Sequence, residues 1–153
     1  MEWLASTIEA SQLGAFARGS SWAYPAANLI HLLGLVLLVG GIGIVDLRLM
    51  GLFPALPLDP LVRALTPLAL AGLALMAISG PILFAADATA LARSSTFALK
   101  LALIVVALAN ALSFQWLRHK RLLQNLSLQR LMAGASIALW LGVAALGRMI
   151  AYS

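Results

Sequence analysis

The chain has 153 residues, of which 63% are hydrophobic and only 10% are charged, and its formal net charge is +5. A soluble domain is about half apolar and about a quarter charged, so this chain is too apolar to fold in water and is predicted to be solvated by lipid. It contains no cysteine, which excludes disulfides, iron–sulfur clusters and thiolate metal sites. The length allows one domain, so residues 1–153 are treated as a single integral membrane domain.

Residues 1–20 are predicted to form an amphipathic helix that lies along the membrane surface. A cleaved signal peptide begins with a cationic region, whereas this segment begins with "MEWLASTIEA" and carries Glu2 and Glu9. Trp3, Ile8 and other apolar residues recur at roughly helical spacing, which gives the helix an apolar face. We therefore expect the segment to be retained and interfacial.

Four long apolar segments follow, and together they predict an all-α, polytopic membrane protein. A helix needs about 20 apolar residues to cross about 30 Å of hydrocarbon. The last two segments are shorter, but Lys or Arg flanks them, and the aliphatic stems of these residues can extend to the interface. The predicted up-and-down four-helix bundle has its transmembrane helices near residues 23–46, 63–86, 97–118 and 130–151.

Prolines and small residues predict how these helices are connected and packed. The stretch "GLFPALPLDP" at residues 51–60 has three prolines in seven residues, which predicts a turn without helix. Pro81 is expected to kink or loosen the end of the second membrane helix, and residues 85–96 to form a small polar loop. Small residues should let neighbouring helices approach closely, namely Gly34, Gly40, Gly41 and Gly43 in the first membrane helix and Gly72 and Gly80, on one face with Met76, in the second.

Basic residues near the helix ends predict the orientation in the membrane. The end that holds residues 47–62 and 119–129 includes "RHKRLLQNLSLQR", the strongest cationic stretch, and is predicted to face the cytoplasm. Both termini would then face outward. Because this placement accounts for the positive net charge, no nucleic-acid partner is expected.

His31 is a titratable residue inside the first membrane helix, about 9 Å along the helix from Pro25. Asn28 and Tyr24 lie three and seven residues before it and share its face. A neutral imidazole can ligate haem iron or copper, and it can relay protons. The alternative is a packed histidine that is hydrogen-bonded to Asn28 or to a neighbouring helix.

Two cations are expected near His31. Lys100 begins the third membrane helix and Arg148 ends the fourth, so antiparallel packing can bring both toward His31 at the outer leaflet. Two cations and an imidazole would suit a carboxylate-bearing cofactor, such as haem with its propionates, or another anionic ligand. The alternative is that both cations extend to lipid phosphates.

The second histidine, His119, lies in the cationic loop at the opposite end of the bundle. The two histidines of one chain therefore cannot ligate the same haem. A haem on His31 would need Met76 or Met149 as its second ligand, an open position, or His31 of a second subunit.

The remaining polar residues of the membrane helices have structural interpretations. Asn110, near the middle of the third helix, is expected to hydrogen-bond across to another helix. Asp46 and Arg48 are expected to cap the first helix and pair locally, or to reach the cationic loop.

The stretch "WAYPAANLIHLLGLVLLVGGIGIVDLRLMG" at residues 22–51 resembles the opening of an uncharacterised bacterial family of small four-helix inner-membrane proteins, a domain of unknown function. The family pattern is Tyr-Pro, then His, then Gly-rich apolar sequence that closes in Asp-Leu-Arg-Leu-x-Gly. The similarity continues through "SGPILFA", "FALKLALIVVALANAL" and "GRMIAY". It implies a multi-pass protein of the bacterial inner membrane and no established activity. One departure is Gln115, where members carry a histidine, so a ligand at that position would be missing here.

Three functions follow from these observations. The chain could be a subunit that binds b-type haem and transfers electrons, a protein that handles copper or a small solute through His31 and methionines, or a structural subunit of a larger membrane complex. A homo-oligomer is compatible with the haem and transport functions. Hydrolase and nucleotide-binding motifs are absent from the sequence, so an enzyme acting by itself is not expected.

Overall fold

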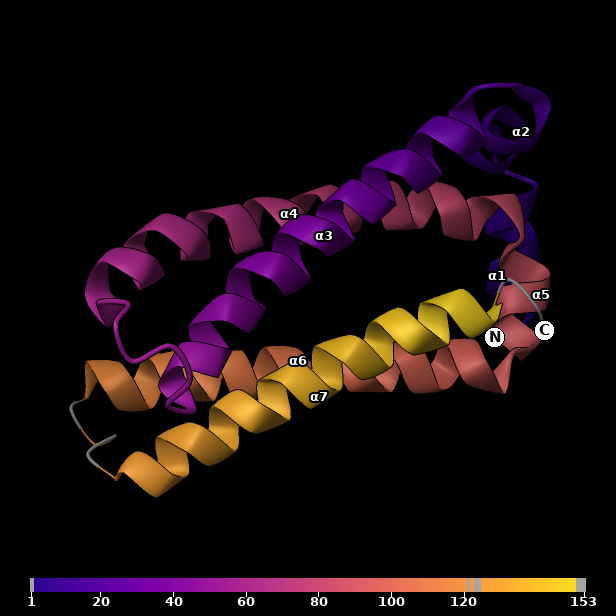
Figure 1. Ribbon diagram of the computed structural model, residues 1–153. Coiled ribbons are helices and arrows are strands. Elements are labelled where there is room, and N and C mark those ends of the chain that lie inside the picture. Colours follow the sequence, from indigo (N-terminus) through magenta and orange to yellow (C-terminus); the bar gives the residue numbers. More distant parts are fainter. Residues whose placement is uncertain (1, 121, 123–124, 151–153) are drawn as a thin grey trace.

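The computed structural model describes residues 2–120, 122 and 125–150, and this part of the chain is helical, without strands (Figure 1). Four of its helices, α3, α4, α6 and α7, are long and apolar enough to cross a membrane. The prediction of an all-α membrane protein with four spanning helices is therefore confirmed. The elements are α1 (Glu2–Glu9), α2 (Gln12–Gly19), α3 (Ala23–Leu49), α4 (Leu58–Ala86), α5 (Ala88–Arg93), α6 (Ser95–His119) and α7 (Leu126–Ile150).

The four long helices run up and down as two packed pairs, α3 with α4 and α6 with α7, and α3 joins the pairs by packing on α7 (Figure 1). Glu2 and Ile150 lie at one end of the bundle, which we call the terminal end. The other end carries Arg48, Arg63 and Arg118, and we call it the basic end. His31 lies toward the terminal end and His119 at the basic end, so one chain does not bring them together.

Close packing of α3 on α4 depends on Gly34 and Gly72. A Cβ atom on Gly34 would lie 2.7 Å from the carbonyl oxygen of Gly72, and a Cβ atom on Gly72 would lie 2.6 Å from the amide nitrogen of Leu38. Gly40 and Gly43 face away from this contact, because nothing described lies within 4 Å of a Cβ atom on either. The sequence therefore indicated that glycines of α3 pack on a neighbour, but not which of them do so.

The centre of the bundle is filled by Trp140 of α7. It packs in one buried cluster with Leu38 of α3, Ala69 of α4 and Ala107 of α6, so side chains from all four long helices meet there. Met76 of α4 packs against the same cluster. The large Trp140 ring fills the space between these smaller side chains.

The N-terminal segment is two short helices, where a single interfacial helix was predicted. Ser11 separates them and caps α2, its hydroxyl accepting a hydrogen bond from the amide of Gly14 at 3.4 Å. A Cβ atom on Gly14 would meet the backbone oxygens of Glu9 and Ala85, so α2 lies tightly on the end of α4. Apolar side chains still point outward and are available to the membrane interface, namely Trp3, Leu4, Leu13, Phe16 and Trp22.

Polar contacts fasten this N-terminal unit (α1 and α2) to the terminal end. The Glu9 carboxylate accepts a hydrogen bond from the Thr89 amide at 2.8 Å, in the first turn of α5. Arg18 donates to the backbone oxygens of Glu9 at 2.7 Å and Ala86 at 3.3 Å. The prediction that residues 85–96 form a loop is wrong, because a carboxylate at the N-terminus of α5 and the fully buried Ala88 stabilise a helix there.

The prolines before α4 allow this helix to begin earlier than predicted. Pro57 is extended and precedes α4, which begins at Leu58 rather than near residue 63. Pro60 lies in the first turn, where the amide has no intrahelical partner and its loss costs little. The prediction that residues 51–60 exclude helix is therefore wrong from Leu58 onward. Pro67 and Pro81 both lie inside α4.

Substituting alanine for Gly34 tests the α3–α4 contact. Overpacking against the Gly72 carbonyl should lower the free energy of unfolding by about 1–3 kcal/mol. Gly40→Ala is the matched control on the same helix and should change it by less than about 0.5 kcal/mol. Equal effects in a detergent unfolding titration would contradict this packing.

Glu9 makes the N-terminal unit sensitive to pH. Hydrogen bonds from Thr89, helped by the charge of Arg18, hold the pKa of Glu9 below its ordinary value. A lowered pKa in the folded state means that the contact stabilises docking at neutral pH and is lost as the pH falls through that value. Hydrogen exchange of the Thr89 amide should lose protection over this range in the native protein, whereas Glu9→Gln should show weaker, pH-independent protection. A loss of protection that is the same in both proteins would contradict a role for Glu9.

Candidate functional site

His31 of α3 is held by Ser79 of α4. The Nδ1 atom of His31 lies 2.9 Å from the Ser79 hydroxyl, and this hydroxyl donates to the carbonyl oxygen of Leu75 at 2.7 Å. Ser79 is fully buried, and a Cβ atom on Gly80 would lie only 3.7 Å from Cε1 of the imidazole. Ser79 and Gly80 therefore form the surface against which the half-buried ring packs.

One tautomer of the ring satisfies both contacts. A serine hydroxyl has one proton, and when this proton is donated to Leu75 the hydroxyl accepts the proton of His31 Nδ1. In the neutral ring the lone pair is then on Nε2, which has no hydrogen-bond partner among the residues described. A histidine fixed in this way is oriented like a metal ligand or a proton acceptor.

Lys100 of α6 approaches the same site from the opposite pair of helices. Its ammonium group lies within electrostatic range of His31, and it would be 3.4 Å from a Cβ atom on Gly147 of α7. The side chain is half-buried, and no acidic residue in the described part of the chain forms an ion pair with it. His31, Ser79, Lys100 and Gly147 thus bring all four long helices to one polar level near the terminal end.

The other predicted site residues are placed differently. Arg148 is exposed at the end of α7, next to Gly147. Asn28 is exposed on α3, and it is Ser79, not Asn28, that hydrogen-bonds to His31. Met149 is also exposed. Nothing in the sequence distinguished Ser79 from the other small residues of "MAISGP", because a lone serine in an apolar helix is common and its partner lies on another helix.

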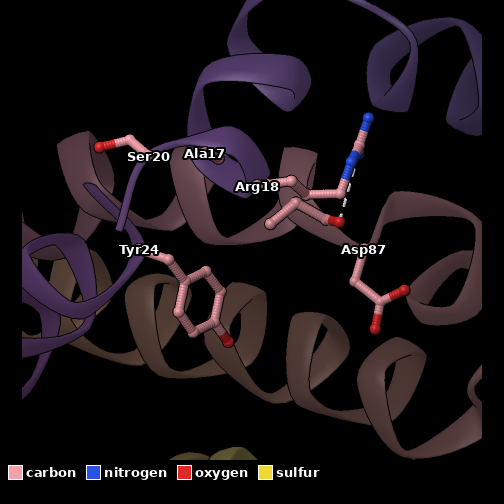
Figure 2. Close-up of a pocket in the computed structure, with 6 residues that line it drawn as sticks. Ala17, Arg18, Ser20, Tyr24 and Asp87 are labelled. Atoms are coloured by element: carbon pink, nitrogen blue, oxygen red, sulfur yellow. Dashed lines mark hydrogen bonds between the residues drawn. The ribbon is translucent and has the colours of Figure 1, made fainter. Parts of the chain in front are cut away.

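Tyr24 belongs to a different feature, a surface pocket of about 360 Å³ between α2 and the end of α4. Arg18, Ser20 and Asp87 also line it (Figure 2). In Figure 2 the Arg18 guanidinium and the Asp87 carboxylate point away from each other, and Arg18 is hydrogen-bonded to the end of α4. His31 and Lys100 do not line this pocket, so it is not an extension of the His31 site.

The residues present do not fit a haem that one chain encloses. His31 Nε2 could serve as one axial ligand and Lys100 could pair with a propionate. Met76, however, packs into the core beside Trp140, and its Cγ would lie 2.8 Å from a Cβ atom on Gly34. Met76 is therefore engaged in helix packing, whereas Met149, the other candidate, is exposed at the end of α7. The centre of the bundle is filled by side chains.

A metal site made from acidic and histidine side chains is equally incomplete. Within residues 2–120, 122 and 125–150, no three His, Asp or Glu side chains are grouped so that they could hold a metal ion. Any metal bound by His31 would need ligands from methionines, from a second copy or from a partner.

Asn110 and Arg48 behave as predicted, but Asp46 does not. The Asn110 side chain donates to the carbonyl oxygen of Met132 at 3.1 Å and so links α6 to α7. Arg48 donates to the carbonyl oxygen of Leu56 at 2.7 Å and stabilises the turn after α3. Asp46 was expected to cap or pair locally, yet it is buried against α7.

Comparison of the chain with protein-family models, with curated proteins and with solved structures finds no match. The resemblance of residues 22–51 to a bacterial membrane family therefore stays a prediction, and the function is argued from the geometry alone.

Removing the Ser79 hydroxyl should release the His31 tautomer. In Ser79→Ala, the ¹⁵N spectrum of His31 should change from a pure Nδ1–H form to a mixture, since nothing else described bonds Nδ1. His119→Gln as the background leaves His31 as the only histidine. The exposed Ser95→Ala is the matched control, and a tautomer unchanged in Ser79→Ala would contradict the assignment.

Proposed function

We propose that this protein is an integral protein of the bacterial inner membrane that binds a carboxylate-bearing cofactor or ligand at the His31 site. The observation that carries the proposal is the half-buried Lys100 ammonium, which lies near His31 and has no acidic partner among the described residues. A cation in a membrane bundle is costly unless a counter-charge or a polar group compensates it. A ligand carboxylate at this level would supply that charge.

His31 would complete the recognition. Its Nε2 lone pair can accept a proton from a ligand acid or hydroxyl group, and it can coordinate a metal ion carried by a cofactor. Because Ser79 occupies Nδ1, Nε2 is the ring nitrogen left for a ligand. A ligand that reaches the site from the bilayer would be amphipathic, with its acidic group beside Lys100 and its apolar part among the exposed helix faces.

A b-type haem, and with it electron transfer, is one form of this proposal. Because Met76 is engaged in helix packing, a haem would take His31 from each of two copies or keep one position open. In the bound state the haem would supply reversible one-electron redox chemistry. The chain would supply His31 as a ligand and Lys100 as a counter-charge.

A structural role is the second candidate, and the exposure of α6 favours it. In the described part of the chain, the backbone of α6 approaches closely only that of α7 and the short α5. Its contacts with α4 are made by side chains, such as Phe97, which stacks on Phe84. Its outer face exposes the apolar side chains of Leu101, Val105, Val106, Leu112 and Trp116. This face could be covered by lipid or by another membrane subunit.

The basic end supports an orientation with both termini outside the cytoplasm. Arg48, Arg63, Arg118 and Lys120 lie at this end. Cytoplasmic loops of membrane proteins carry an excess of Lys and Arg. The His31 site would then lie in the periplasmic half of the membrane.

The first test is the visible spectrum of protein purified in mild detergent from cells supplied with haem. Bound haem should give a Soret band and sharp bands after reduction with dithionite, and His31→Ala should abolish them. A spectrum without a Soret band excludes the haem form of the proposal and leaves the carboxylate site to be tested directly.

The direct test uses octanoate as an anionic probe and octylamine as its cationic control. Octanoate should shift the ¹⁵N signals of His31 in a saturable way, because its carboxylate would lie beside Lys100. In Lys100→Gln the affinity for octanoate should fall about tenfold or more, which corresponds to about 1.4 kcal/mol of lost charge-assisted hydrogen bonding. Equal responses to octanoate and octylamine would contradict an anion site and favour the structural role.

A further inference from the structure

Asp46 is the second titratable group inside the bundle, and the ligand proposal does not use it. It lies on α3 toward the basic end, and only 5% of its surface is exposed. Its Oδ2 atom has no hydrogen-bond partner among the residues described. Ser136 of α7, which is also buried, is a polar residue beside the carboxyl. A buried carboxyl with an unused oxygen implies that something compensates its charge.

No charged side chain described on α3, or on the helices packed against it, compensates the charge of the Asp46 carboxylate. On α3 itself, Arg48 is engaged by the carbonyl oxygens of Leu56 and Pro54. On α4, Asp59 pairs with Arg118 at 3.4 Å, and Arg63 is exposed. On α7 the Arg130 guanidinium lies beside Gly51, while Arg148 of α7 and Arg18 of α2 belong to the terminal end. No ion pair to Asp46 forms within the described ranges.

The oxygen count at Asp46 indicates which cation can bind there. A calcium ion takes six to eight oxygen ligands and a magnesium ion needs near-octahedral coordination. Asp46 and Ser136 together offer three side-chain oxygens, and Asp46 belongs to no group of three His, Asp or Glu side chains in the described part of the chain. A proton needs only one oxygen, and it removes the charge that burial makes costly.

We propose that Asp46 and Ser136 form a proton-binding site in the half of the bundle nearer the basic end, in which the Asp46 carboxyl holds an exchangeable proton. The O–H bond forms on one carboxyl oxygen, and Ser136 hydrogen-bonds to the carboxyl. The proton comes from and returns to water at the basic end. The site is independent of His31, because the two residues are 15 positions apart on α3, about 22 Å along the helix. The apolar Trp140 and Val143 lie between Ser136 and Gly147 on α7.

Infrared spectroscopy of protein labelled with ¹³C at the aspartate carboxyl tests this proposal. The chain has only three aspartates, and the other two, Asp59 and Asp87, are exposed. In the double variant Asp59→Asn/Asp87→Asn, Asp46 is the only labelled carboxyl. At neutral pH this protein should show the labelled C=O band of a carboxylic acid, and the band should move to lower frequency in D2O.

Further variants test whether the acid band comes from Asp46 and whether it depends on Ser136 or on His31. The band should be absent from Asp46→Asn, shifted in frequency in Ser136→Ala, and unchanged in His31→Ala. If Asp46→Asn fails to fold, the double variant still decides the question, because any acid band in it comes from Asp46. Three results would overturn the proposal. The double variant could show carboxylate bands and no acid band at neutral pH, its acid band could fail to move in D2O, or the band could be lost in His31→Ala.

Discussion

The close approach of α3 and α4 at Gly34 and Gly72 is the contact on which the rest of the arrangement depends. In a bilayer no hydrophobic force drives apolar helices together, so association relies on close van der Waals packing and on polar contacts. The backbones meet where a methyl group would collide with a carbonyl oxygen. This contact sets the register of the pair, and it brings His31, three residues from Gly34, opposite Ser79.

The second pair of helices is joined to the first through the side chain of Trp140. One ring contacts smaller residues of the neighbouring helices, so α6 meets α4 through side chains and not through a close approach of the backbones. The consequence is an apolar layer in the middle of the bundle with a polar level on each side of it. His31, Ser79 and Lys100 form one level, and Asp46 with Ser136 forms the other.

The N-terminal unit shows how a short polar segment can be fixed to a membrane bundle. Glu9 satisfies a free amide at the start of α5, and Arg18 satisfies carbonyl oxygens at the end of α4. Helix ends leave such groups without intrahelical partners. The unit therefore compensates two helix termini at once, while its apolar side chains, such as Trp3 and Trp22, stay exposed toward the surroundings.

The sequence by itself determined the number of membrane helices, their approximate limits and the ends at which His31, Lys100 and His119 lie, because bilayer thickness fixes helix length and alternating spans fix the ends. It also identified Asn110 as an interhelical contact. Only the tertiary structure decided that Ser79 is the partner of His31, that Arg148 and Asn28 are exposed, and that Asp46 is buried. The physical reason is that α3 is apolar on every side, so its sequence carries no periodic signal for rotation about the helix axis, and that rotation is set by the glycine contact with α4.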